Sequence, residues 1–152
     1  MKSLVYVFRL AVVTALLAVT MLNATPAVKA AGSILYVSPG PWSGGPCDSW
    51  ATACDLQVAL GIAGTGDEIW VSSGTYIPTI DGDRTKSFML KNGVAIYGGF
   101  KGIQTSRNDR DPSANVTILS GDLNGDDGPN FSNNTENSYH VIVGGHIDNT
   151  AV

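Results

Sequence analysis

Short apolar runs, each ended by glycine or another turn-forming residue, recur along the chain after residue 33. Their β-branched and aromatic residues, bounded by Gly, Asn, Asp or Pro, are typical of strands rather than helices. The runs lie at 34–37, 68–71, 87–90, 94–100, 116–122 and 139–145. The pattern therefore predicts a protein built mainly from short strands and turns.

One segment, 55–63, instead repeats its apolar residues at helical spacing. Asp55 suits the first position of a helix, and Gly64 suits the stop. The apolar positions are Leu56, Ala59, Leu60 and Ala63. A helix of about two and a half turns is too short to be stable alone in water, so we expect it to lie on an apolar surface.

Glycines recur among the predicted strands at intervals of roughly 24 residues, a period typical of stacked repeats. The glycines are Gly74, Gly99, Gly121 and Gly145, and the residues three positions before them are Val71, Ile96, Ile118 and Ile142. A β-sandwich would instead need tight two-residue hairpins, for which the Asn-Gly at 92–93 is the nearest candidate. The repeat favours a parallel coil in which like residues stack and glycines form the corners.

The segments 66–79, 87–100 and 116–127 resemble the N-terminal portion of right-handed parallel β-helix proteins of the pectin-lyase-like superfamily. Within that superfamily they especially resemble large exported bacterial surface proteins of the polymorphic-outer-membrane or adhesin-like kind. Residues 49–71 resemble that family's entrance, a helix that plugs the first coil. The resemblance covers 34–145 and implies an all-β solenoid start with one short N-terminal capping helix. It implies little about activity, because this fold carries lyases, hydrolases, epimerases and adhesins.

The chain is expected to have three regions: a signal peptide at 1–30, a cap of strand, disulfide loop and helix at 31–66, and the first β-helix rungs at 67–152. A coil needs both ends covered, and the last residues read as the start of another strand. We therefore expect an incomplete coil, with C-terminal rungs supplied by a longer protein. Leu56, Leu60 and Ile62 are the predicted lid, and the predicted inward residues are Ile69, Val71, Phe88, Leu90, Val94, Ile96, Ile118 and Ile142.

The first 30 residues have the pattern of an export signal, with Lys2 and Arg9 before an apolar stretch at 10–22 and small residues before a cut after Ala30. The stretch is shorter than the roughly 20 residues that span a bilayer, so a retained anchor is the weaker alternative. Removing the signal, which includes Lys29, leaves 6 basic and 13 acidic residues, a net charge of −7. This charge disfavours nucleic acid and anionic membranes as partners. We expect a secreted or cell-surface protein, associated in bacteria with the outer membrane, and no membrane span in the mature chain.

Cys47 and Cys54 are the two cysteines of the chain. In an exported protein such a close pair predicts a disulfide, with a stabilisation of about 2 to 3 kcal/mol from loop entropy. A zinc site is the alternative, but zinc would need further Cys or His ligands at suitable spacing.

An acidic stretch that begins at the end of the 116–122 segment is the candidate metal site. It offers Asp122, Asn124, Asp126 and Asp127, and oxygen ligands at such spacing suit Ca²⁺. The stretch departs from the EF-hand loop, since Asp127 replaces the required glycine and Asn133 the bidentate glutamate. These departures favour a solvated turn, with a Ca²⁺ site as the alternative interpretation.

No constellation of catalytic residues is evident, so none is predicted. Arg107 and Arg110 do not reproduce the Arg-Pro-Arg pattern of pectate lyases, and we expect them to pair with Asp109, Asp111 or other neighbours on a solvated corner. The histidines, His140 and His146, have no catalytic partner nearby in sequence. We therefore expect a structural, adhesin-like or glycan-binding protein, with Trp42 as a candidate sugar-stacking ring. The alternative is a polysaccharide lyase or hydrolase whose active rungs lie beyond this chain.

Overall fold

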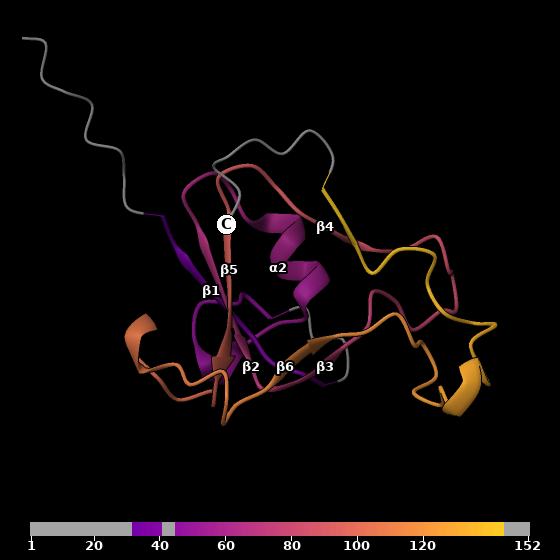
Figure 1. Cartoon of the computed structure of the whole chain (residues 1–152). Helices are drawn as coiled ribbons and strands as arrows, with labels where there is room; N and C mark the ends of the chain where they lie inside the picture. Colours follow the sequence, from indigo (N-terminus) through magenta and orange to yellow (C-terminus); the bar gives the residue numbers. More distant parts are fainter. Residues whose placement is uncertain (1–31, 41–44, 145–152) are drawn as a thin grey trace, which may run out of the picture. The chain divides into compact units, whose positions relative to one another are not determined.

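A computed structural model describes residues 32–40 and 45–144, which hold seven short strands, one α-helix and three 3₁₀ helices (Figure 1). The strands are β1 (Ile34–Val37), β2 (Glu68–Ser72), β3 (Gly74–Tyr76), β4 (Phe88–Met89), β5 (Ala95–Phe100), β6 (Thr117–Leu119) and β7 (Ile142–Val143). The helices are α2 (Leu56–Ile62), η1 (Trp50–Thr52), η2 (Arg107–Asp109) and η3 (Pro129–Phe131). The predicted signal peptide at 1–30 lies outside the described residues, as do Trp42 and His146.

The strands form three small sheets in which every pair is parallel. The sheets are β1-β2-β5, β3-β6 and β4-β7. The chain thus passes through β2, β3 and β4, and then through β5, β6 and β7 in the same order, with each later strand beside its earlier counterpart. Because parallel neighbours cannot be joined by a tight hairpin, the long connections between them are a consequence of this pairing.

The roughly 24-residue glycine repeat does not set the observed register, and that prediction was wrong. The observed partners are Val37 for Val71, Ile69 for Ile96, Thr75 for Ile118 and Phe88 for Ile142. The length of chain between paired residues differs from sheet to sheet. In the first sheet it runs from Glu68 to its partner Ala95, whereas in the third it is about twice as long, from Phe88 to its partner Ile142. Surface loops absorb such unequal insertions at small entropic cost, so the sequence period and the structural period differ.

The apolar core lies between α2 and the inner faces of the strands. The predicted helix at 55–63 is confirmed as α2, and its first turn is capped by Asp55, whose Oδ1 accepts a hydrogen bond of 2.8 Å from the Gln57 amide. The helix contacts β1, β2 and β4. The core residues are Leu35, Val37, Cys47, Cys54, Leu56, Ala59, Leu60, Ala63, Ile69, Val71, Tyr76, Phe88 and Val94.

Three predicted core residues are instead exposed: Ile62, Ile118 and Ile142. Ile118 pairs with the exposed Thr75, so its side chain faces outward and Leu119 packs against the core instead. Side chains alternate along a strand, and a register error of one residue reverses the face. Ile142 does pair with the buried Phe88, but it lies on an edge strand, and within the described residues no strand covers it. Leu90 is half-buried, and Ile96 packs partly buried against the core.

Aromatic side chains cover the opposite, outer face of the β1-β2-β5 sheet. We call Tyr36, Trp50, Trp70 and Phe100 the aromatic cluster. Trp70 stacks on Phe100 with ring centroids 4.7 Å apart and meets Tyr36 edge-on at 5.7 Å. The remaining contacts join Trp50 to Tyr36 and to Phe100. Both tryptophans therefore pack against other aromatic rings on the outer face of this sheet.

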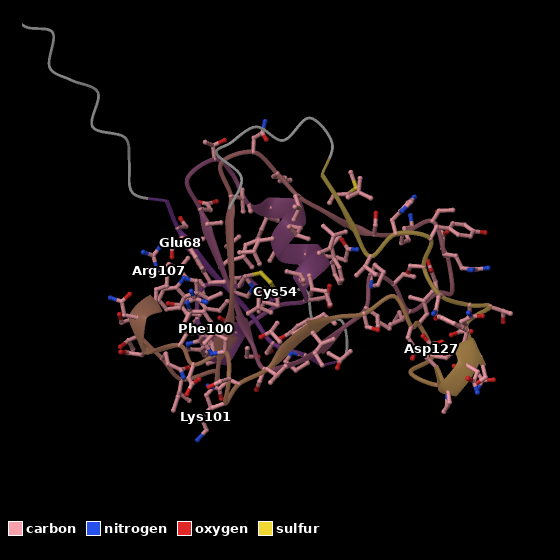
Figure 2. The ribbon with its side chains drawn as sticks, viewed as in Figure 1. Cys54, Glu68, Phe100, Lys101, Arg107 and Asp127 are labelled. Carbon is pink, nitrogen blue, oxygen red and sulfur yellow. A yellow bond between two sulfur atoms is a disulfide. The ribbon has the colours of Figure 1, made fainter. Side chains whose placement is uncertain are left out.

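The predicted disulfide between Cys47 and Cys54 is present, and both cysteines are fully buried (Figure 2). The bonded loop is also tied to β1 through the backbone of Tyr36. The Tyr36 amide donates to the Cys47 carbonyl at 2.8 Å, and the Cys54 amide donates to the Tyr36 carbonyl at 3.0 Å. The disulfide thus fixes the loop against the first strand of the sheet.

Candidate functional site

Two polar clusters stand out on the described surface. One lies where the loop after β5 folds back over Tyr97, and we call it the Tyr97 pocket. The other, the acidic cluster, lies in the loops between β6 and β7. Figure 2 shows Arg107 of the first cluster and Asp127 of the second well apart, so the two are separate sites.

The Tyr97 pocket depends on a loop that is fastened to the strand it leaves. The carbonyl of Gly99 accepts hydrogen bonds from the Asp111 amide at 2.8 Å and from Asn115 Nδ2 at 3.3 Å. Gly99 has a φ of 91°, and a Cβ there would lie 2.8 Å from atoms of Pro112. Only glycine permits this close approach, so the sequence fixes where the loop crosses the strand.

The start of the same loop is held by a second set of contacts. Trp50 of the aromatic cluster donates from Nε1 to the Gln104 carbonyl at 2.8 Å. Ser106 caps η2 by accepting a hydrogen bond from the Asn108 amide. The 3₁₀ turn that carries Arg107 therefore has a defined start, and the residues before it are held by Trp50.

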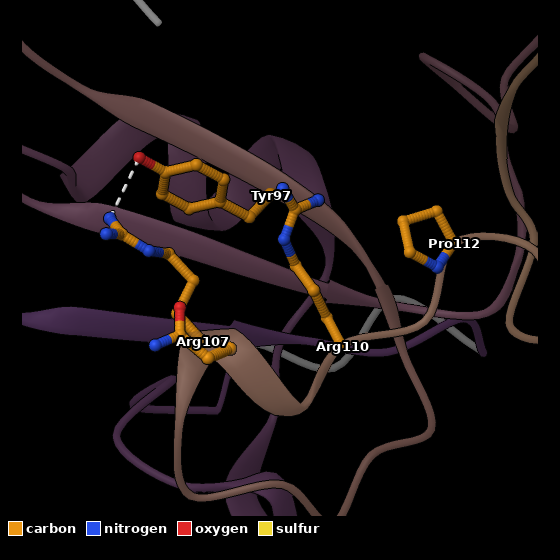
Figure 3. A pocket seen from close by; sticks show the side chains of 5 residues that line it. Tyr97, Arg107, Arg110 and Pro112 are labelled. Atoms are coloured by element: carbon orange, nitrogen blue, oxygen red, sulfur yellow. Dashed lines mark hydrogen bonds between the residues drawn. The ribbon is translucent and has the colours of Figure 1, made fainter.

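The two arginines of this loop lie beside one tyrosine ring (Figure 3). The Arg107 Cζ atom is 4.8 Å from the Tyr97 ring centroid, and its Nη1 donates to Tyr97 Oη at 3.0 Å. The Arg110 Cζ atom is 5.4 Å from the same centroid. These distances allow cation–π attraction. The side chains surround an open cavity of about 510 Å³, lined by Tyr97, Arg107, Asn108, Arg110 and Pro112.

The two guanidinium groups differ in how their charge is balanced. Arg107 Nη1 forms an ion pair of 2.8 Å with Glu68 Oε1, a long-range partner on β2. This corrects the expectation, because the acids next to Arg107 in sequence, Asp109 and Asp111, are not its partners. Arg110 forms no ion pair among the described residues, and its hydrogen bond, to the Gly98 carbonyl, is 3.4 Å long. The pocket therefore has one compensated and one uncompensated cation.

Asp111 does not neutralise Arg110 because it is used locally. Its Oδ1 accepts hydrogen bonds from the amides of Ser113 at 3.0 Å and Ala114 at 3.1 Å, and from the Ser113 hydroxyl. These bonds, led by that from the Ser113 side chain, lower the pKa of the Asp111 carboxyl. The carboxylate is ionised and occupied in building the turn that follows η2.

The acidic cluster consists of Asp122, Asp127 and Glu136, which each place one carboxylate oxygen within 4.8 Å of the others. Two of the four sequence candidates, Asp122 and Asp127, are thus brought together, whereas the carboxyl of Asp126 is not part of this group. Glu136 was not among the sequence candidates, because nothing in the sequence between 127 and 136 indicates that the chain folds back to Asp122 and Asp127.

The three carboxylates of the acidic cluster differ in their existing partners. Asp122 accepts hydrogen bonds from the amides of Asp127, Gly125 and Asp126, and these bonds, led by that from Asp127, lower the pKa of its carboxyl. Asp127 Oδ2 accepts from Asn137 Nδ2 at 2.8 Å. Glu136 Oε1, by contrast, is shielded from solvent and has no hydrogen-bond partner. Asp122 therefore stabilises the turn, whereas Glu136 has a carboxylate oxygen without a hydrogen-bond donor among the described residues.

The acidic cluster is linked to the strand region through Arg84. Its Nε donates to the Asn137 carbonyl at 2.7 Å, and its guanidinium lies 4.6 Å from the centroid of the Tyr139 ring. The Tyr139 amide in turn donates to the Arg84 carbonyl at 2.9 Å. His140, the next residue, is exposed. These contacts hold the acidic loop against the segment that leads into β4.

Comparisons with protein-family models, with curated proteins and with solved structures gave no match to this chain. Among the described residues, no helix has the length and apolar character needed to cross a membrane.

Proposed function

We propose that this chain is the N-terminal part of an exported, cell-surface right-handed parallel β-helix protein of the pectin-lyase-like kind. The observation that carries the proposal is the strand order: β2, β3 and β4 pair in parallel with β5, β6 and β7, each with its counterpart. Two successive turns of one coil produce this pairing. A right-handed coil is the expected hand, because crossovers between parallel strands are almost always right-handed.

The helix and the sheet edges support the remaining parts of the fold proposal. The apolar face of α2 packs against β1, β2 and β4, as a cap on the first turn of a coil would. On the other side, β5, β6 and β7 are edge strands in the described structure. Further C-terminal rungs in a longer protein would pair with these edges and cover Ile142.

Export is supported by the disulfide, because such bonds persist in oxidising compartments. We infer a structural, adhesin-like or glycan-binding role rather than catalysis. The side chains of the Tyr97 pocket are guanidinium, amide and ring groups, which bind and orient ligands. We assign no catalytic residue.

The competing function is a polysaccharide lyase or hydrolase whose active rungs lie beyond residue 152. The full-length gene product would be incubated with acidic polysaccharides, with and without Ca²⁺, while unsaturated products and new reducing ends are measured. We expect no cleavage and retained binding to glycan or to the cell surface. Ca²⁺-dependent cleavage would instead establish the enzyme.

We propose a second, structural function for the acidic cluster, which is to hold one Ca²⁺ ion. Carboxylate oxygens are suitable ligands, and the unpartnered Glu136 Oε1 is the observation that favours a cation here. Asp122 and Asp127 would supply the other carboxylates. The ion would hold the turn at 122–127 against Glu136, which lies later in the same loop between β6 and β7.

Ca²⁺ is expected to raise the melting temperature of the chain, because it binds the folded state alone. At 100 times its dissociation constant it would add about 2.7 kcal/mol of stability. The shift should disappear in Asp127→Asn and persist in Asp126→Asn, whose carboxyl lies outside the cluster. Melting curves of the three proteins in Ca²⁺ and in chelator test this, and an equal shift in all three would refute the site.

A further inference from the structure

The Tyr97 pocket combines a defined cavity with one unbalanced positive charge. Glu68 neutralises Arg107, whereas no carboxylate in the described part of the chain pairs with Arg110. The chain is acidic overall, and Arg110 is the group beside this cavity whose positive charge has no carboxylate partner among the described residues. A ligand that carries an anionic group would complement it.

The size and lining of the pocket restrict the ligand further. A cavity of about 510 Å³ is within the usual range for small ligands. Arg107 and Asn108 offer nitrogen donors beside the charge, and Pro112 and Tyr97 offer ring surfaces. Several donors around a single cation, next to apolar carbon, match a sugar ring with hydroxyl groups and one acidic substituent.

The loop needs little reorganisation to bind. Its crossing point is fixed by two hydrogen bonds to the Gly99 carbonyl, and its start is fixed by Trp50 and by the Ser106 cap. A site held in this way loses little conformational entropy when a ligand binds. Arg110 is therefore presented to solvent from a fixed backbone, although its side chain is exposed.

We propose that the Tyr97 pocket binds an acidic saccharide through a carboxylate or sulfate group that pairs with Arg110. Arg107 and Asn108 donate hydrogen bonds to the hydroxyl groups of the same residue, and Pro112 contacts its C–H surface. The inference deepens the glycan-binding role proposed above and rests on it, since it names the class of glycan and the residue that selects it.

The test measures binding of the purified chain to alginate, which carries carboxylates, to dextran sulfate, and to uncharged dextran. We expect binding to one or both polyanions and none to dextran. Arg110→Gln should weaken that binding about tenfold, because it removes a charge-assisted pair. Lys101→Gln is the matched control: it removes one exposed positive charge from the same loop but lies outside the pocket lining, and it should change binding little.

A second variant has an effect of opposite sign. Glu68→Gln releases Arg107 from its ion pair while keeping an amide oxygen that can accept the Trp70 Nε1 hydrogen bond. The pocket then contains two uncompensated cations, so polyanion binding should tighten several-fold. If polyanions bound the chain only through its overall charge, Glu68→Gln would tighten binding no more than the loss of another acid, such as Asp109→Asn.

Several results would overturn the inference. These are no polyanion binding by the chain, equal weakening in Arg110→Gln and Lys101→Gln, or tighter binding of polyglutamate than of either polysaccharide. Surface attachment of the full-length gene product, measured on cells with the Arg110→Gln variant, separates the two proposals. If the variant still attaches to cells and the purified chain binds neither polyanion, the proposal of an acidic-saccharide site is wrong, while the proposed surface role stands.

Discussion

Trp70→Ala is expected to destabilise the chain by about 3 to 5 kcal/mol, the usual cost of truncating a large buried aromatic residue. Trp70 is 2% exposed, stacks on Phe100, meets Tyr36 edge-on, and donates from Nε1 to Glu68 Oε2 at 2.8 Å. Its removal opens a cavity in the aromatic cluster on the outer face of the β1-β2-β5 sheet and leaves Glu68 Oε2 without this donor. Equilibrium unfolding in urea at 25 °C measures the change.

The control for this substitution is Ile118→Ala, which also truncates a large strand residue. Ile118 is 48% exposed and pairs with an exposed threonine, so its loss should cost less than about 1 kcal/mol. Equal destabilisation by the two substitutions would contradict the assignment of Trp70 to a packed cluster and of Ile118 to the outer surface.

Replacing both cysteines by alanine should cost about 2 to 3 kcal/mol, because the bond closes a short loop in the unfolded chain. The loss should be concentrated at β1, whose Tyr36 exchanges hydrogen bonds with both cysteines. Urea unfolding gives the total, and amide exchange at Tyr36 gives the local effect. Faster exchange at Tyr36 than at strands remote from the disulfide is the expected pattern.

A reducing agent provides the matched control for the cysteine replacement. It should lower the stability of the unmodified chain to about that of the double variant and leave the variant unchanged. A double variant as stable as the unmodified chain would show that loop entropy contributes nothing here, and would remove the disulfide from the account of how β1 is held.

The sequence predicts the elements of this fold well where the pattern is local. The helical spacing after Asp55 locates α2, and the alternation through Ile69 and Val71 identifies the buried face of β2. It does not predict the register, because the loops between strands differ in length and carry no apolar pattern. Ile118 shows the consequence, since a one-residue shift of the expected face leaves it in solvent.

The sites were predicted less completely than the strands. Asp122 and Asp127 were recognisable as a local acidic motif, but Glu136 joins them through a turn of the chain that no spacing rule describes. The Glu68–Arg107 ion pair joins residues that are 39 apart in sequence, and neither residue belongs to a recognisable sequence motif. Such contacts depend on which strands lie side by side, and that depends on the register.

The central claim is that successive strands lie parallel, each beside its counterpart in the previous turn. Through-hydrogen-bond NMR couplings between backbone amides and carbonyls test it most directly at β4 and β7. Parallel pairing predicts couplings from the Phe88 amide to the Val141 carbonyl and from the Leu90 amide to the Val143 carbonyl. Couplings that join 87–90 to 94–100 as a hairpin across the turn at 92–93, or an antiparallel order between β4 and β7, would contradict the account.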